Sequence, residues 1–87
     1  MPHHFLDIRH LLCPMPIIHV QNRIANLESG EVLELVATDP GVLMDIPTWV
    51  RINGHRLLAS QHEAGEIRMI IEVVNHPQQQ NQSITPP

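Results

Sequence analysis

Apolar positions change their spacing along the chain, and each change predicts a different element of secondary structure. Residues 5–8 form a short apolar run with a single charge, which is typical of a strand. After Pro14 the apolar residues recur at steps of three and four, as in the core stripe of an amphipathic helix: Ile17, Val20, Ile24 and Leu27. Because glycine accepts a left-handed conformation, Ser29 and Gly30 predict the end of this helix.

A second strand and a second helix follow in the pattern. Residues 31–38 are rich in valine and leucine and predict a strand. We expect a helix over residues 41–53, because Asp39 can cap it and Pro40 fits its first turn. Pro47 lies inside this helix, where a proline removes one backbone donor. It predicts either a kink or a later start of the regular turns at that point.

Two more strands are predicted over residues 55–62 and 66–75. The residues between them, 63–65, predict a three-residue hairpin turn that ends on glycine. Residues 76–87 are polar, contain proline and show no periodicity. We therefore expect one folded domain over residues 1–75, followed by a disordered tail.

The predicted element order, βαβαββ, indicates an α+β fold, a two-layer α/β sandwich. Its mixed four-stranded sheet is expected to carry both helices on one face. The opposite face is expected to be mixed, with charged residues between its apolar ones: Val32, Val36, Ile70 and Val74. Such a face is either ordinary surface apolarity or a contact for a partner or a second copy of the chain. The sequence is thus compatible with a monomer or a weak homodimer.

The composition argues against several classes of function. The 87 residues carry a formal net charge of −4 and include no lysine, so the basic surface of a nucleic-acid-binding protein is missing. No apolar run approaches the roughly 20 residues of a membrane span, and residues 1–9 do not resemble a signal peptide. We expect a cytoplasmic protein that contacts neither nucleic acid nor a membrane directly.

The candidate chemistry centres on Cys13, the one cysteine of the chain. It precedes the first predicted helix, whose first turn is expected to contain Pro14 and Pro16. A sulfur at the cap of a helix faces unpaired N–H groups and the positive end of the helix dipole, which lower a thiol pKa and create a nucleophile. The alternative from the residues alone is a structural cysteine that happens to precede a helix.

Several motifs around this cysteine resemble, in order, those of the TusA/SirA-type sulfur carriers. The similarity begins with residues 6–9 (LDIR) and 11–17 (LLCPMPI), which contain the family's Cys-Pro-x-Pro motif. It continues with these shorter matches: Gly30-Glu31, Asp39-Pro40, Asp45-Ile46-Pro47-x-Trp49 and Gly54-His55-x-Leu57-Leu58. It covers roughly residues 5–74, nearly all of the predicted domain.

The resemblance implies the same βαβαββ fold and a role as a sulfurtransferase that works as a covalent carrier. Cys13 is then the catalytic residue, with Pro14, Pro16 and His10 as supporting residues of its motif. The cysteine accepts sulfane sulfur as a persulfide from a donor such as a cysteine desulfurase or a rhodanese. It relays that sulfur to an acceptor sulfurtransferase, for example toward tRNA thiolation, without a cofactor.

Three positions depart from the family pattern. His10 stands where the family has a glycine, and a protonated imidazole there either favours the Cys13 thiolate or is simply a solvated loop residue. Gln21 and Asn22 stand where relatives carry lysine or arginine, which leaves the usual desulfurase docking in doubt.

Other functions compete with the carrier hypothesis. Cys13 as a redox sensor shares the reactive thiol, whereas a regulatory protein-interaction module does not need it. Histidines near the cysteine, His3, His4 and His10, invite a metal site, but their spacing is not that of a zinc site, so no metal is expected.

Overall fold

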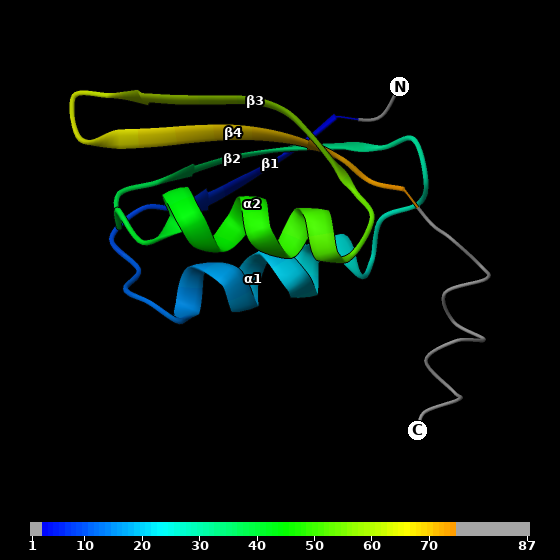
Figure 1. Ribbon diagram of the computed structural model, residues 1–87, viewed down its shortest axis with the longest axis horizontal. Helices are drawn as coiled ribbons and strands as arrows, with labels where there is room; N and C mark the ends of the chain where they lie inside the picture. The colour runs from blue at the N-terminus through cyan, green and yellow to red at the C-terminus, as the bar shows by residue number, and fades with distance from the viewer. Residues whose placement is uncertain (1–2, 75–87) are drawn as a thin grey trace.

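A four-stranded sheet forms one layer of the molecule and two helices form the other (Figure 1). The computed structural model describes residues 3–74. The elements, in chain order, are β1 His3–Ile8, α1 Met15–Ile24, β2 Val32–Ala37, α2 Val42–Ile52, β3 Arg56–Glu63 and β4 Glu66–Glu72. The predicted α+β fold, its βαβαββ order and the placement of both helices on one face of the sheet are therefore confirmed.

The strands lie in the order β1-β2-β4-β3, so β2 and β4 are central and β1 and β3 are edges. The sheet is mixed: β1 runs parallel to β2, while β4 is antiparallel to both β2 and β3. The parallel register ends with Ile8 opposite Ala37. Because parallel strands end at the same edge of a sheet, the loop after β1 and the turn after β2 lie beside each other. This edge carries Cys13.

The core lies between the sheet and the helices. Alternate residues of the central strands face inward, as the two-residue period of a strand requires. The helices add residues at steps of three and four, including Leu27 just beyond α1. The buried residues are Ile8, Val20, Ile24, Leu27, Leu33, Leu35, Ala37, Val42, Ile46, Val50, Ile67, Met69, Ile71 and Val73. Aliphatic burial thus anchors both helices to the sheet, and Val42 does so at the start of α2, next to the Cys13 edge.

The helix boundaries differ from those predicted. The first helix ends at Ile24 instead of continuing to the glycine, and the backbone then turns, with the N–H of Leu27 donating to the carbonyl of Ile24 at 3.0 Å. The second helix begins at Val42 and continues through Pro47, so of the two alternatives predicted for Pro47 the later start of the regular turns is wrong. A proline costs one backbone hydrogen bond there, and the buried side chains on both sides of it offset that loss.

The β3–β4 hairpin turn is shorter than predicted. Glu63 pairs with Glu66, which leaves a two-residue turn, Ala64-Gly65. Both turn residues have positive φ angles, 52° and 79°, as in the turns that match the twist of a two-residue hairpin. The strand β4 ends at Glu72, and the predicted domain end at residue 75 and the tail over 76–87 lie outside the described residues.

The face of the sheet opposite the helices is mixed, as the sequence predicts. Val36 is only 2% exposed there, because the neighbouring strands place polar side chains beside it, whereas Phe5 is half exposed. Glu34 pairs with Arg68 and with His3 across this face. Among residues 3–74, no helix is long and apolar enough to cross a membrane.

Candidate functional site

Cys13 is exposed in the loop that joins β1 to α1. It lies one residue before the helix cap, which is Pro14, so the prediction of a cysteine at the cap is wrong by one position. Two prolines in the first turn, Pro14 and Pro16, have no N–H to offer. The N–H of Met15 donates to the carbonyl of Leu12 at 2.8 Å. Three of the positions expected to stabilise a thiolate, Pro14, Met15 and Pro16, therefore offer no free donor.

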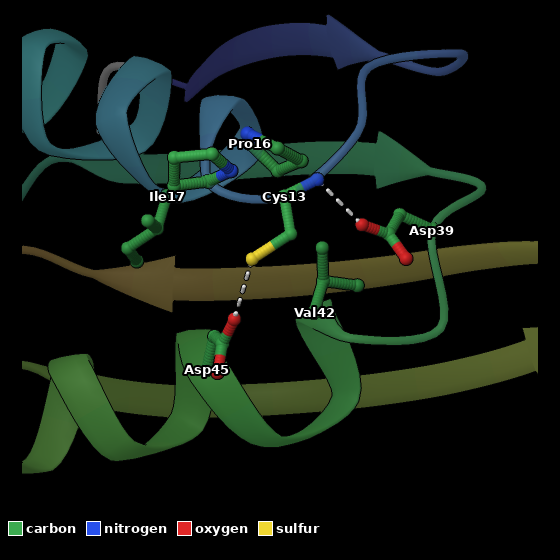
Figure 2. A pocket seen from close by; sticks show the side chains of 7 residues that line it. Cys13, Pro16, Ile17, Asp39, Val42 and Asp45 are labelled. Atoms are coloured by element: carbon green, nitrogen blue, oxygen red, sulfur yellow. Dashed lines mark hydrogen bonds between the residues drawn. The ribbon is translucent and has the colours of Figure 1, made fainter.

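Asp39, in the turn after β2, holds the backbone of the cysteine (Figure 2). Its Oδ2 accepts the N–H of Cys13 at 2.8 Å, and its Oδ1 accepts the N–H of Gly41 at 3.1 Å. The helix cap of α2 is Gly41, so Asp39 lies too early to cap the helix as predicted. Its carboxylate instead joins the Cys13 loop to the start of α2.

Asp45, in the first turn of α2, contacts the sulfur itself (Figure 2). The Cys13 Sγ donates to Asp45 Oδ2 at 3.6 Å. The sulfur lies in a shallow depression at the edge of the helix layer. Its lining consists of Cys13, Pro14, Pro16, Ile17, Asp39, Val42 and Asp45. The two aspartates are the only charged residues of this set.

These surroundings raise the pKa of the Cys13 thiol above its ordinary value. Partial desolvation contributes most, followed by the hydrogen bond to Asp45 and the negative charges of Asp45 and Asp39. The predicted lowering of this pKa is therefore wrong. The helix start was expected to supply positive potential, but the fold places two carboxylates there, and a negative neighbour disfavours a second negative charge.

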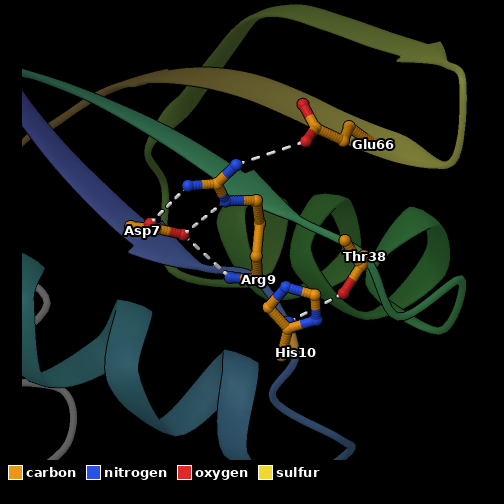
Figure 3. A network of polar contacts seen from close by, with 5 residues as sticks. All are labelled: Asp7, Arg9, His10, Thr38 and Glu66. Carbon is orange, nitrogen blue, oxygen red and sulfur yellow. Dashed lines mark hydrogen bonds and ion pairs between the residues drawn. The ribbon is translucent and has the colours of Figure 1, made fainter.

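The supporting residues of the motif lie at different distances from the sulfur. Pro14 and Pro16 both line the depression, and Pro16 is also buried against the core side of α1. His10 is not part of that lining. Its backbone has a φ of +69°, the left-handed conformation that glycine adopts freely, and its N–H donates to Thr38 Oγ1 at 2.8 Å (Figure 3). A supporting role of these three residues in catalysis stays a prediction.

An ion-pair network holds the start of the same loop (Figure 3). Arg9 pairs with Asp7 at 2.9 Å and with Glu66 at 3.3 Å, which ties β1 to β4 across the end of β2. The hydrogen bond from the Arg9 side chain is the largest of the effects that lower the pKa of Asp7 to about 2. Sequence reasoning had not assigned this network, although residues at i and i+2 share one face of an extended chain.

Two of the three histidines that invited a metal site are engaged elsewhere through their rings. His3 contacts Glu34 at 3.0 Å and His4 contacts Glu31 at 2.7 Å, both through Nε2. Over residues 3–74 there is no group of three or more side chains placed to hold a metal ion.

Sequence reasoning missed two site residues, Asp39, which was expected only to cap a helix, and Asp45. Asp45 contacts the sulfur itself. It belongs to a run that resembles the family pattern, Asp45-Ile46-Pro47, but only the packing of α2 against α1 brings its carboxylate to the sulfur. The available signal was an acidic residue in the first helical turn, and that signal indicates helix stabilisation as readily as chemistry.

Known proteins are similar to this chain in sequence. The family model described as sulfurtransferase TusA matches residues 4–73. YrkF of Bacillus subtilis (strain 168) is 36% identical over 81 residues, which cover 93% of this chain and 44% of that protein. Sulfur carrier protein TusA of Pseudomonas putida (strain W619) is 41% identical over 64 residues, 74% of this chain and 80% of that one.

A sulfur carrier protein TusA from Allochromatium vinosum is 34% identical over 67 residues, 77% of this chain and 88% of that one. The chain therefore spans less than half the length of YrkF but most of the length of the two TusA proteins.

Proposed function

The chain belongs to the TusA sulfurtransferase family, and on that basis we propose that it is a sulfur carrier whose persulfide is held on Cys13. The observation that carries this proposal is the placement of the single cysteine. Cys13 is exposed at the tip of a loop, so a partner's cysteine can reach it without opening the fold. Its backbone is held by Asp39, which gives the sulfur a defined position.

The proposed transfer is a thiol–persulfide exchange that balances without an external oxidant. Cys13 attacks the outer sulfur of a donor cysteine persulfide, a new S–S bond forms at Sγ, and the donor's own S–S bond breaks. The thiol proton of Cys13 ends on the departing donor cysteine. An acceptor thiol then attacks the outer sulfur on Cys13, the S–S bond at Sγ breaks, and the acceptor's thiol proton returns Cys13 to its thiol form.

The partners follow from this chemistry as proposals. The donor is a cysteine desulfurase or a rhodanese, because both present sulfane sulfur on a cysteine. The acceptor is a second sulfurtransferase, with tRNA thiolation as one destination. We place the relay in the cytoplasm, where reducing conditions keep a lone exposed cysteine as a thiol. In this role the chain is a sulfurtransferase that acts as a covalent carrier.

The acidic surroundings of Cys13 favour the carrier over the redox-sensor alternative. Sensor cysteines react because they are accessible and have a low pKa. The carboxylate 3.6 Å from the sulfur opposes thiolate formation in the free protein. A carrier needs its thiolate only in a complex with a partner.

Intact mass spectrometry tests the carrier function directly. The chain is incubated with a cysteine desulfurase and cysteine, or with a rhodanese and thiosulfate, alongside the Cys13→Ser variant. We expect a gain of one sulfur atom that a reductant reverses and that the variant does not show. If Cys13 can be alkylated but gains no sulfur from either donor, the assignment to these donors is wrong.

A further inference from the structure

We infer that Asp45 keeps Cys13 in its thiol form in the free carrier, and that it is the docking point for a basic side chain of the partner. Pairing of that side chain with the carboxylate then releases the thiolate for sulfur transfer. The inference rests on the proposed carrier function, because it assigns the partner's chemistry to the same site.

The contact between Cys13 and Asp45 supports the first part of the inference, that Asp45 keeps the cysteine in its thiol form. A thiol donates a hydrogen bond to Asp45 Oδ2 at 3.6 Å, and a thiolate cannot donate one. Ionisation of Cys13 therefore replaces a hydrogen bond with repulsion between two negative charges. The second carboxylate of the depression, Asp39, adds to this repulsion, and the pKa of Cys13 is raised accordingly.

Asp45 is available to a partner, whereas Asp39 is not. Both oxygens of Asp39 accept backbone N–H groups, from Cys13 and from Gly41. Within residues 3–74, the one hydrogen bond to the Asp45 side chain comes from the Cys13 thiol. The Asp45 side chain is also exposed.

No cationic side chain is among the residues that line the depression. The residues that line the depression come from the Cys13 loop with the start of α1, the turn after β2 and the start of α2, and their charges are those of the two aspartates. The arginines of the helices, Arg23 and Arg51, lie in the last turns of α1 and α2, at the ends away from Cys13. Arg9, at the start of the Cys13 loop, is paired with Asp7 and Glu66, so we assign the positive charge that acts on Asp45 to the partner.

An apolar groove continues from the depression, and a partner that covers it would make the Cys13 thiolate less stable unless it also supplied a positive charge. Two of its lining residues, Ile17 and Asp45, also line the depression. The whole lining consists of Ile17, Met44, Asp45, Thr48, Trp49 and Ile52. Met44 and Ile52 are 74% and 71% exposed. A partner that reaches the sulfur also covers this groove and removes water from Asp45 and Cys13. Desolvation alone would disfavour the thiolate still more, so the partner has to supply a cation.

The step balances within the exchange already described. The basic side chain pairs with the Asp45 carboxylate, and the S–H bond of Cys13 breaks with its electron pair left on Sγ. That pair forms the bond to the donor's outer sulfur, the donor's S–S bond breaks, and the proton ends on the donor cysteine.

The first test measures the rate at which iodoacetamide, a neutral reagent, alkylates Cys13 as a function of pH. We expect Asp45→Asn to shift the midpoint to lower pH and to speed alkylation at pH 7 by about fivefold, the size of a close charge interaction at an exposed site. Asp45→Glu keeps the charge and should stay slow. Unchanged kinetics in Asp45→Asn would overturn the inference.

A matched control separates this local effect from net charge. Glu28→Gln makes the same change of charge on an exposed side chain beyond the far end of α1, about 15 Å or more along the helix from Cys13. Its alkylation profile should match that of the unmodified chain. An equal acceleration in Glu28→Gln would mean that overall charge, and not Asp45, sets the reactivity.

The second test asks whether Asp45 attracts a cation. Cys13 reacts with three small disulfides, cationic cystamine, neutral bis(2-hydroxyethyl) disulfide and anionic dithiodiglycolate, and each rate is divided by the rate of Asp45→Asn. The intrinsic reactivity of each disulfide cancels in this ratio. We expect the ratio to be severalfold higher for cystamine than for dithiodiglycolate. Equal ratios for the three reagents would overturn the docking of a basic group.

Failure of this inference is distinguishable from failure of the carrier function. Persulfide loading of the unmodified chain by a donor enzyme is measured by mass alone, without any substitution at Asp45. Loading together with unchanged alkylation in Asp45→Asn would sink the role of Asp45 only. Absence of loading from either donor would sink the assigned sulfur donors and leave the two kinetic tests interpretable.

Discussion

The carboxylate of Asp39 accepts the backbone N–H of Cys13 at 2.8 Å, although the two residues are 26 positions apart in the chain. Parallel pairing of β1 with β2 brings their loops to one edge of the sheet, and this hydrogen bond joins the loops there. The other oxygen of Asp39 accepts the N–H of Gly41. One side chain thus positions both Cys13 and the start of the helix that carries Asp45.

Asp39→Ala should loosen the Cys13 loop. It removes two hydrogen bonds to backbone N–H groups, each with a net contribution of about 1 kcal/mol, so we expect a loss of about 1–2 kcal/mol in the free energy of unfolding. Urea unfolding followed by circular dichroism measures this. The stability of Asp39→Asn, which keeps one acceptor oxygen, should lie between those of Asp39→Ala and the unmodified chain. A variant as stable as the unmodified chain would contradict the role of Asp39.

His10→Gly should stabilise the chain slightly. His10 has a φ of +69°, which glycine adopts without a steric cost, whereas a residue with a Cβ is strained there. We expect a gain of up to about 1 kcal/mol, reduced by the larger entropy of glycine in the unfolded chain. His10→Val, with a branched Cβ, should destabilise the chain by about 1 kcal/mol or more. Melting temperatures of the three proteins provide the comparison.

The same substitution also tests whether the imidazole tunes the cysteine. His10 is not among the residues that line the depression, so His10→Gly should leave the rate of Cys13 alkylation unchanged between pH 6 and 8, to within about twofold. A rate that falls severalfold at the acid end of this range would indicate that a protonated His10 favours the thiolate.

Arg9→Gln should raise the pKa of Asp7 from about 2 toward its ordinary value near 3.9, but not all the way, because the backbone N–H of residue 9 still donates to this carboxylate. The folded-state pKa is below the unfolded one, so the contact stabilises the fold above pH 4 and that contribution is lost as the pH falls toward 2. The stability difference between Arg9→Gln and the unmodified chain should therefore shrink as the pH falls from 4 through 2, and should vanish only below pH 2. Titration of the Asp7 carboxyl by NMR measures the pKa, with Glu66→Gln as a control in which it stays low.

Leu35→Ala should cost far more stability than Leu58→Ala. Leu35 is fully buried in the central strand β2, where the loss of its side chain leaves a cavity, and we expect about 2–5 kcal/mol. Leu58 is 53% exposed in the edge strand β3, so the same substitution should cost less than about 1 kcal/mol. Chemical denaturation of both variants measures the two losses in the free energy of unfolding. Similar losses would mean that the core does not lie between the sheet and the helices.

The elements of the fold were largely predictable because their apolar periods are local. The steps of three and four that include Val20 and Ile24, and the alternation along β4, give the type of each element without any knowledge of distant residues. The ends of the elements were less predictable. The turn after Ile24 and the two-residue hairpin at Ala64-Gly65 depend on small differences in backbone energy, which the packing of neighbouring residues decides.

The sequence by itself determined the order of the elements, the composition of the core and the identity of the one cysteine. These properties follow from side-chain chemistry and from spacing along the chain. Only the tertiary structure decided the electrostatic surroundings of that cysteine. Asp39 and Asp45 reach Cys13 because β1 and β2 end at one edge and α2 starts beside α1. Coulomb interactions depend on distance in space, which the sequence does not give. The position of Cys13 before a helix therefore predicts a stabilised thiolate, whereas the folded chain places two carboxylates beside this cysteine.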